Sequence, residues 1–244
     1  GIRMEHVSYG YEGRARALQD VSLTIPKGSV VALVGLSGCG KSTTASLLMR
    51  FCDATAGHIY MDGKDYHSMK PEELRKHIAM VPQQVNLFSG TIRENLLLAD
   101  PDADDQTLME AVKEAGLLKF VQSLEKGLNS DVGNAGASLS GGQRQKIGIA
   151  RALLSKAEYM IFDEATSSVD PESEKEIWDT ISRLAHTRTL IIISHRMSSV
   201  RSAHCIYVLK DGQVAQQGNH EALMAQDGLY RQLVLRQQTM EVTE

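Results

Sequence analysis

Residues 35–42 read Gly35-Leu36-Ser37-Gly38-Cys39-Gly40-Lys41-Ser42 and match the pattern G-x-x-x-x-G-K-[ST]. They follow the apolar run Val30–Val34 and precede the helical pattern Thr43–Arg50, so they join a buried strand to a helix. Glycines let backbone N–H groups turn toward one anion, and a helix start adds unpaired donors and partial positive charge. The segment from Gly35 to Thr43 therefore predicts a nucleotide phosphate site. In it, Lys41 contacts the β- and γ-phosphates and the Ser42 hydroxyl ligates Mg²⁺.

The composition excludes several classes of protein. The 244 residues are 42% hydrophobic and 23% charged, as in an ordinary globular protein, which argues against disorder or a collagen-like chain. The formal charge of -4 gives no basic footprint for nucleic acid. The three cysteines, Cys39, Cys52 and Cys205, form no metal or redox pattern and indicate reduced thiols. No apolar run approaches the roughly 18 residues that a membrane span needs.

Three apolar runs predict strands that are buried on both faces. They are Val30–Val34, Tyr159–Phe162 and Leu190–Ile193, and Ile78–Val81 is a weaker fourth. Near-continuous runs of branched residues are typical of a parallel sheet covered by helices. Helical patterns lie between these runs, so we expect an α/β fold.

Other parts of the chain predict additions to this core. The runs Ile206–Lys210 and Gln213–Ala215 flank Asp211-Gly212, a strong hairpin signal, and Ile59–Met61 before Asp62-Gly63 repeats this pattern. Residues 1–25 alternate apolar and polar residues, which favours antiparallel strands. Residues 92–156 carry apolar residues at helical spacing, which predicts a helical insertion.

Two carboxylates and a histidine follow predicted strands. Asp163 and Glu164 come at the end of one run, where open α/β sheets bind ligands. Successive strand residues point to opposite faces, so we expect different roles: Asp163 holds Mg²⁺ and Glu164 polarises the attacking water. The pair could instead cap a helix. His195 follows a third strand and could donate to the γ-phosphate, and the residues alone leave this role open.

A further motif brings in a known family. Leu139-Ser140-Gly141-Gly142-Gln143 precedes the helical pattern Arg144–Leu154 and is a second potential anion site. Together with the loop at 35–42 and the acidic pair at 163–164, it resembles the nucleotide-binding domain of an ATP-binding cassette (ABC) transporter. The resemblance covers essentially all of the chain.

The resemblance implies a role for each motif. Residues 35–42 are the Walker A loop, Tyr159–Asp163 the Walker B strand and Glu164 the catalytic glutamate. Ser140, Gly141, Gly142 and Gln143 belong to the signature motif, which contacts ATP, and Asp170 belongs to the D-loop Ser168-Val169-Asp170.

Three single residues complete the implied site. Gln83 is the Q-loop glutamine that senses Mg²⁺, with Gln84 as a less favoured choice. His195 is the switch histidine. Tyr11 stacks on adenine, and Tyr9 is its rival; stacking of this kind contributes roughly 1–3 kcal/mol.

The resemblance also implies an architecture. A P-loop NTPase (RecA-like) core with a mainly parallel sheet and an antiparallel β subdomain would comprise residues 1–91 and 157–244. An inserted α-helical subdomain, bearing the signature motif, would comprise residues 92–156. Family members work as head-to-tail dimers in which ATP lies between the Walker A loop of one copy and the signature motif of the other.

Finer features resemble the exporter branch of the family. Leu87–Asn95, Gly218–Leu223 and Gly228–Tyr230 match exporter segments, which implies ATP hydrolysis coupled to transport at the cytoplasmic face of a membrane. A transmembrane domain would precede Gly1 in a longer polypeptide or belong to a partner chain. One departure is Asn134, which stands where exporters usually have a glutamate at the membrane-domain contact.

Several alternatives compete with this interpretation. A P-loop kinase or GTPase lacks the signature motif, and a soluble DNA-repair or translation cassette carries coiled coils or a second cassette. A degenerate cassette would lack Lys41, Asp163, Glu164 or His195, and all four are present. The ATPase subunit of an importer is the nearest rival. A thiol close to a helix start can have a lowered pKa, so we also expect Cys39 either to react at the nucleotide entry and be protected by ATP, or to be a small filler residue in the loop.

Overall fold

The computed structural model describes residues 1–10 and 12–243. Its main sheet has six strands in the order β10-β9-β3-β8-β7-β6, and all neighbours are parallel except β9 and β10. All four apolar runs are strands of this sheet, so the predicted α/β core is confirmed. The strands are β3 (Val30–Val34), β6 (Ile78–Val81), β7 (Tyr159–Asp163), β8 (Thr189–Ser194), β9 (Cys205–Lys210) and β10 (Gln213–Gly218).

A second sheet of four antiparallel strands has the order β2-β1-β4-β5. Asp62-Gly63 joins β4 to β5, and Asp211-Gly212 joins β9 to β10, each with positive φ at both residues (49° and 81°, 51° and 77°). These are the angles of a type I′ turn, which confirms the hairpin predictions. The strands are β1 (Ile2–Tyr9), β2 (Leu18–Ile25), β4 (Ala56–Met61) and β5 (Lys64–Asp65).

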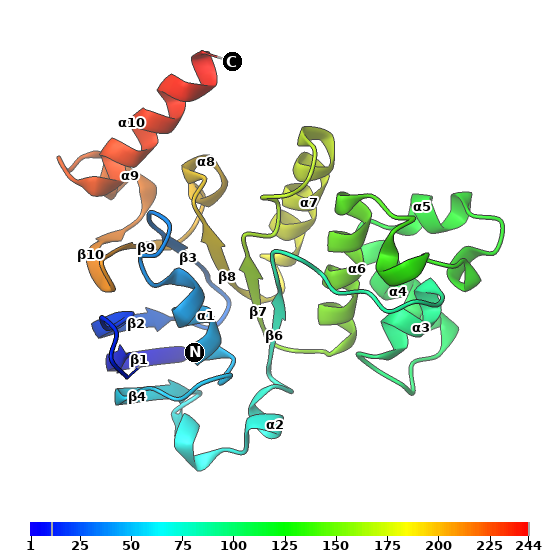
Figure 1. Ribbon diagram of the computed structural model, residues 1–244, viewed down its shortest axis with the longest axis horizontal. Coiled ribbons are helices and arrows are strands. Elements are labelled where there is room, and N and C mark those ends of the chain that lie inside the picture. The colour runs from blue at the N-terminus through cyan, green and yellow to red at the C-terminus, as the bar shows by residue number, and fades with distance from the viewer. Residues whose placement is uncertain (11, 244) are drawn as a thin grey trace.

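Helices cover the main sheet and form an insert between β6 and β7 (Figure 1). The insert holds α3 (Ile92–Leu97), α4 (Asp105–Glu114), α5 (Leu118–Ser123) and α6 (Gly141–Leu154), as its helical spacing predicts. None of the helices in the described part of the chain has the length and apolar character needed to cross a bilayer. The other helices are α1 (Lys41–Leu48), α2 (Pro71–Leu74), α7 (Pro171–Leu184), α8 (Met197–Val200), α9 (His220–Met224) and α10 (Leu229–Val242), with 3₁₀ turns at Tyr66–Ser68, Gly127–Asn129 and Asn134–Gly136.

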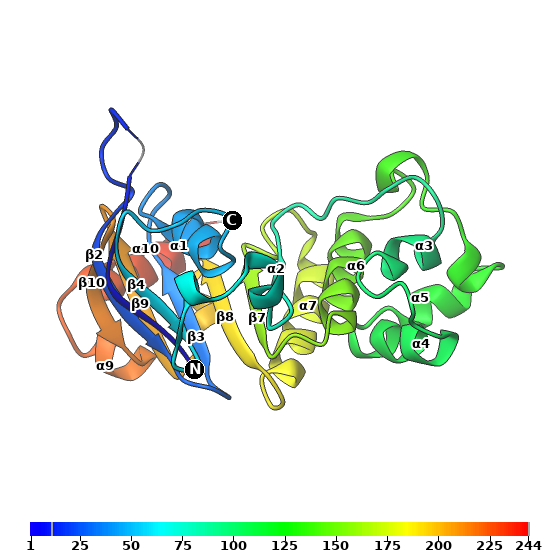
Figure 2. The same cartoon turned by 90° about the horizontal axis from the view of Figure 1, so that it is seen from below.

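Alternate residues of each central strand belong to two different hydrophobic cores. In β3, Val31 and Leu33 face α1 and the antiparallel sheet, whereas Ala32 and Val34 face the core that contains α6 and α7. Figure 2 shows α1 between the two sheets, with the helical insert on the far side of the main sheet. Because both faces of the sheet are covered, its strands read as unbroken apolar runs.

Candidate functional site

A cavity of about 570 Å³ opens where β3, β7 and β8 end. Val34 pairs with Ser194, and Asp163 pairs with Ile193, so the three strands stop at the same edge of the sheet. The loops that follow these strands therefore meet, which is where parallel α/β sheets bind ligands.

The loop after β3 forms one wall of the cavity, and two of its glycines are required by geometry. Gly35 (φ 153°) and Gly40 (φ 112°) adopt backbone conformations that L side chains rarely reach. A Cβ at Gly35 would lie 2.4 Å from the Leu209 carbonyl oxygen, and one at Gly40 would lie 2.6 Å from Leu18 Cδ2. Both glycines therefore allow close approach as well as the turn itself.

The start of α1 faces this cavity. The helix begins at Lys41, two residues earlier than the sequence pattern predicts, and Gly40 at its N-cap provides no side-chain hydrogen bond. The first N–H groups of a helix have no intrahelical acceptor, so they remain available to an anion. The cavity is lined by all of the predicted loop residues except Cys39: Gly35, Leu36, Ser37, Gly38, Gly40, Lys41, Ser42 and Thr43.

Lys41 lies inside the curve of the loop. Its side chain is buried, and its Nζ donates to the carbonyl of Gly35 and, at 3.4 Å, to that of Leu36. Neutral carbonyls, rather than a carboxylate, accept these hydrogen bonds of the ammonium. A phosphate entering the cavity would meet a cation that is already oriented.

The two carboxylates after β7 both line the cavity, which corrects the expectation that they point to opposite faces. The strand ends at Asp163, and Glu164 has a φ of 51°, outside the β region. The alternation of side chains along a strand does not extend past the strand's end. Their different surroundings distinguish the two residues instead.

Asp163 occupies the more apolar surroundings. Burial, and to a lesser extent the neighbouring charge of Glu164, raise the pKa of the Asp163 carboxyl above its usual range, while Lys41 opposes this shift. A charged carboxylate is thus disfavoured here unless a cation stabilises it.

Glu164 contacts the histidine that follows β8. His195 Nδ1 lies 2.7 Å from Glu164 Oε2. Because an ionised carboxylate only accepts hydrogen bonds, Nδ1 is the donor in this contact, and Nε2 is left for another partner. The backbone N–H of Glu164 donates to the Ile193 carbonyl at 2.9 Å, which ties the turn after β7 to β8.

Gln83 lies just after β6 and also lines the cavity. Gln84, which the structure also describes, does not line it. The Gln83 carbonyl accepts a hydrogen bond from Gln145 Nε2 of α6. Gln145 is buried, so this contact joins the loop after β6 firmly to the helix that begins at Gly141.

The fold and the motifs agree with comparisons to known proteins. A family model described as ABC transporter matches residues 18–167. The chain belongs to the ABC transporter family. Its fold is that of the ATP-binding and ATP-hydrolysing domain of ABC exporters, as the sequence resemblance predicts.

Individual relatives match nearly the whole chain. The ABC-type transporter kk1G of Curvularia clavata is 45% identical over 96% of this chain and 18% of its own length. The human mitochondrial potassium channel ATP-binding subunit is 43% identical over 97% of this chain and 32% of its own length. The ATP-dependent lipid A-core flippase 1 of Colwellia psychrerythraea is 44% identical over 89% of this chain and 36% of its own length. The chain therefore spans only about a fifth to a third of these relatives.

A solved structure has the same fold. The structure of a bacterial Atm1-family ABC exporter with ATP bound superposes with a TM-score of 0.91 at 38% identity. The match covers 97% of this ABC domain and 41% of that chain.

The signature motif of this ABC domain and its Walker A loop line different cavities. Ser140 Oγ accepts from the Gln143 N–H at 3.1 Å, and Gln143 Oε1 accepts from the Ser140 N–H at 2.9 Å, a capping box that fixes the start of α6. Ser140, Gly142 and Gln143 line a cavity of about 610 Å³, and Gly141 lines one of about 280 Å³. Neither cavity includes a described residue of the Walker A loop.

Asp170, a predicted ATP contact, does not line the Walker A cavity. Asp170 is the N-cap of α7, where its carboxylate accepts from the Ser173 N–H at 3.0 Å. These hydrogen bonds hold the pKa of Asp170 below its usual value. The predicted adenine contact Tyr11 lies outside the described residues, and its rival Tyr9 ends β1.

Four cavity residues escaped the sequence analysis: Ala17, Met197, Leu233 and Gln237. Met197 and Gln237 lie outside every motif, and Leu233 is part of the buried stripe of α10. A usable signal exists for Gln237, because it continues the helical spacing of the buried residues Tyr230, Leu233 and Val234. An amide on an otherwise apolar stripe indicates a specific polar partner.

Cys39 contradicts its predicted reactivity. Its side chain is buried next to Gly35, where a Cβ on Gly35 would lie 2.6 Å from Cys39 Sγ, and it does not line the cavity. Burial raises the pKa of this thiol, and the opposing effects of Lys41 and of backbone hydrogen bonds are smaller. The backbone N–H of Lys41, the first residue of α1, does lower the pKa of the thiol, but this effect is smaller than that of burial.

We expect iodoacetamide to label Cys39 slowly at pH 7, at least about tenfold more slowly than Cys205, because both thiolate content and access are reduced. The rate should rise with pH and change little when ATP is added. Mass spectrometry of tryptic peptides measures both sites in one sample, so Cys205 is the internal reference. Fast labelling that ATP suppresses would show that the thiol opens into the cavity after all.

Proposed function

We propose that this ABC domain is the Mg²⁺-dependent ATPase unit of an exporter and works as a head-to-tail dimer. In this proposal it lies at the cytoplasmic face of a membrane, against a transmembrane domain of the same or a partner chain. Residues 1–91 and 157–244 form its core, and residues 92–156 form a helical subdomain. The observation that supports the dimer is that α1 and α6 begin at different cavities. One chain thus offers two incomplete phosphate sites, and a second copy can complete both.

The binding step uses groups that are already in place. The first N–H groups of α1 and the ammonium of Lys41 hold the β- and γ-phosphates. The signature motif of a second copy, with its own helix start, contacts the γ-phosphate from the other side. Tyr11 stacks on the adenine. The γ-phosphate thus bridges two chains, and the closed dimer depends on it.

The chemical step follows from the position of Glu164. Its carboxylate accepts a proton from the attacking water as the water oxygen bonds to the γ-phosphorus and the bond to the β-phosphate oxygen breaks. His195 holds this carboxylate by the 2.7 Å contact through Nδ1. The products are ADP and phosphate, and loss of the bridging γ-phosphate lets the two chains separate.

The donor groups fit a magnesium ion. Ser42, Gln83 and Asp163 line the same cavity and offer hydroxyl, amide and carboxylate oxygens, which are the hard ligands that Mg²⁺ prefers. A buried carboxylate with a raised pKa gains most from such a cation, because the ion's charge offsets desolvation. The ion supplies charge neutralisation for the phosphates when it is bound.

One further substitution, made in a chain that holds ATP without hydrolysing it, can separate dimer closure from ATP binding. In a Glu164→Gln chain, which should hold ATP without turnover, we expect light scattering to show dimers when ATP and Mg²⁺ are added. Ser140→Asp in the same chain keeps a good helix N-cap but opposes the γ-phosphate with a negative charge. This chain should bind a fluorescent ATP analogue normally and remain monomeric.

The matched control is Ser202→Asp, which adds the same charge at an exposed serine outside both motifs. This chain should dimerise like its parent. If Ser140→Asp abolished ATP binding by the monomer, the signature motif would act within one chain and the proposed dimer would be wrong. The same conclusion would follow if the Glu164→Gln parent stayed monomeric with saturating ATP.

A further inference from the structure

The turn of residues 195–197, between β8 and α8, is held by three separate elements. The His195 side chain contacts Glu164 after β7, and the Arg196 guanidinium pairs with Glu174 of α7. The main chain of the turn is held from a third side by Gln237 of α10. Only this last contact involves the C-terminal helix, and Gln237 lies outside all the sequence motifs.

Gln237 binds the turn with both ends of its side-chain amide. Its Oε1 accepts from the Met197 N–H at 2.9 Å, and its Nε2 donates to the His195 carbonyl. Because the amide is planar, two such bonds fix both the position and the tilt of the peptide segment that carries the His195 side chain. The amide also lies at the wall of the Walker A cavity.

The first half of α10 anchors Gln237. Tyr230, Leu233 and Val234 are buried on one face of the helix, and Gln237 continues that face one turn further. The Tyr230 hydroxyl contacts His220 Nδ1 at 2.8 Å, which adds a fixed point at the helix start.

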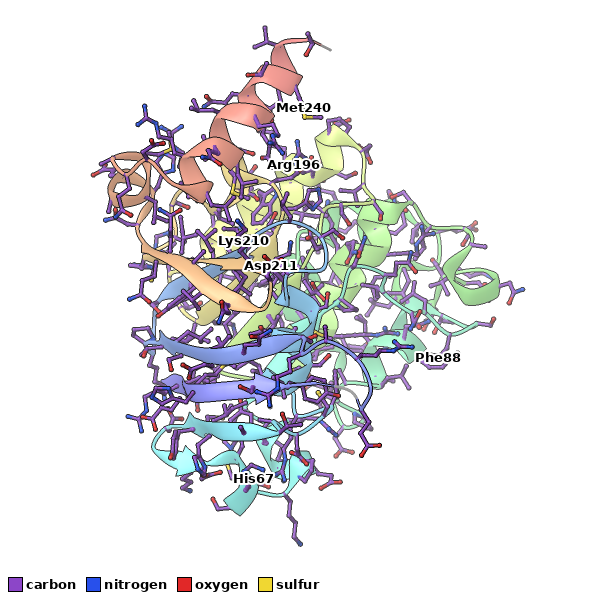
Figure 3. All side chains as sticks on the ribbon, turned by 60° about the vertical axis from the view of Figure 1, so that its left-hand side comes forward. His67, Phe88, Arg196, Lys210, Asp211 and Met240 are labelled. Carbon is purple, nitrogen blue, oxygen red and sulfur yellow. The ribbon has the colours of Figure 1, made fainter. Side chains whose placement is uncertain are left out.

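Beyond Gln237 the helix leaves the body of the domain (Figure 1). Met240 is 63% exposed and Val242 is 88% exposed, and Figure 3 shows Met240 on the outer part of α10, with Arg196 below it. Among the described residues of α10, Gln237 is thus the outermost one that hydrogen-bonds to the turn that carries His195.

We propose that Gln237 is a positioning residue for ATP hydrolysis: it holds the main chain of the 195–197 turn so that His195 keeps Glu164 aligned with the attacking water. This inference rests on the roles proposed above for Glu164 and His195. A misplacement of about 1 Å in a catalytic group can reduce a rate by about a hundredfold, so control of one turn is enough to affect turnover. The C-terminal helix thereby becomes part of the catalytic apparatus.

Two substitutions separate the two hydrogen bonds. Gln237→Met keeps the length of the side chain and removes both bonds. Gln237→Glu keeps an acceptor for the Met197 N–H and loses the donor to the His195 carbonyl. Gln238→Met is the matched control, because Gln238 is the exposed next residue of the same helix.

We expect kcat of Gln237→Met to fall roughly tenfold, with Gln237→Glu between it and the unaltered chain. The affinity of Gln237→Met for a fluorescent ATP analogue should stay within about twofold, because this substitution adds no charge and leaves the phosphate contacts of Lys41 and α1 untouched. Gln238→Met should match the unaltered chain in both measurements. Thermal unfolding establishes that each variant is folded before its rate is measured, and Gln237→Glu carries the test if Gln237→Met is unfolded.

A double-mutant cycle with His195→Ala tests the route of the effect. Gln237 binds the main chain of the turn, so its two hydrogen bonds should survive in His195→Ala, but that variant has no imidazole left to position. Gln237→Met should then cause no further loss in single-turnover rate, whereas a general loss of structure would lower it again.

Three results would overturn the inference: an unchanged kcat in Gln237→Met and Gln237→Glu, losses that multiply in the cycle, or a fall in ATP affinity with kcat unchanged. The last would make Gln237 a nucleotide contact. Failure of this inference can be told apart from failure of the proposed function. If the proposed function were wrong, Glu164→Gln would hydrolyse ATP at the normal rate, whatever the rates of the Gln237 variants.

Discussion

Glu164→Gln should lower kcat for ATP hydrolysis by about a thousandfold, because it removes the carboxylate that accepts the proton of the attacking water. The substitution is close to isosteric, and the amide oxygen can still accept the hydrogen bond from His195 Nδ1, which lies 2.7 Å from the carboxylate in the native protein. The geometry of the turn after β7 should therefore survive. ATP affinity should be unchanged or higher, since one negative charge near the γ-phosphate is removed.

Phosphate release under single-turnover and steady-state conditions measures the loss, and binding of a fluorescent ATP analogue measures the affinity. Glu125→Gln is a suitable control, because Glu125 is exposed on the helical insert away from the cavity. That variant should hydrolyse ATP at the native rate. Turnover of Glu164→Gln within a fewfold of native would mean that another group accepts the proton, and the assignment of Glu164 would fail.

Lys41→Met should weaken ATP binding by about a hundredfold, since it removes at least one charge-assisted hydrogen bond to the phosphates, each contributing about 1.5–3 kcal/mol. Lys41 is buried within the loop and is held by the Gly35 and Leu36 carbonyls. Methionine fills a similar volume without the charge, so the loop should keep its shape. The loss should therefore appear in binding rather than in folding.

Isothermal titration calorimetry with ATP and Mg²⁺ measures this effect, and thermal unfolding without nucleotide establishes that the fold is intact. Lys126→Met removes the same charge at an exposed position and should leave the affinity unchanged. AMP binds through fewer phosphates, so the two proteins should differ much less with AMP than with ATP. An equal loss for AMP and ATP would place the effect of Lys41 outside the β- and γ-phosphates.

The elements that the sequence predicts correctly are those with local causes. The run Val30–Val34 reads as a strand buried on both faces, and its alternate residues do belong to two cores. Asp62-Gly63 and Asp211-Gly212 predict hairpins because a type I′ turn requires positive φ at both residues. The starts of α1 and α6 lie two and three residues before the predicted ones, at Lys41 and Gly141, because helix ends depend on which N–H groups find partners.

The errors concern positions where surroundings override local pattern. Cys39 lies two residues before a helix, yet its side chain is buried away from the cavity lining, and burial raises the pKa of its thiol. Glu164 follows a strand, yet a positive φ turns it to the same cavity as Asp163.

The sequence by itself determined the order of strand, phosphate loop and helix and the carboxylates at the end of β7, because turn chemistry and apolar spacing act within about ten residues. Only the tertiary structure decided that His195 contacts Glu164 across 31 positions of sequence, and that Gln237 supports the turn beside it across 40 and 42. These contacts arise because the sheet aligns the ends of β7 and β8 and the buried face of α10 docks beside them. Their partners are set by packing between distant segments, which no local pattern records.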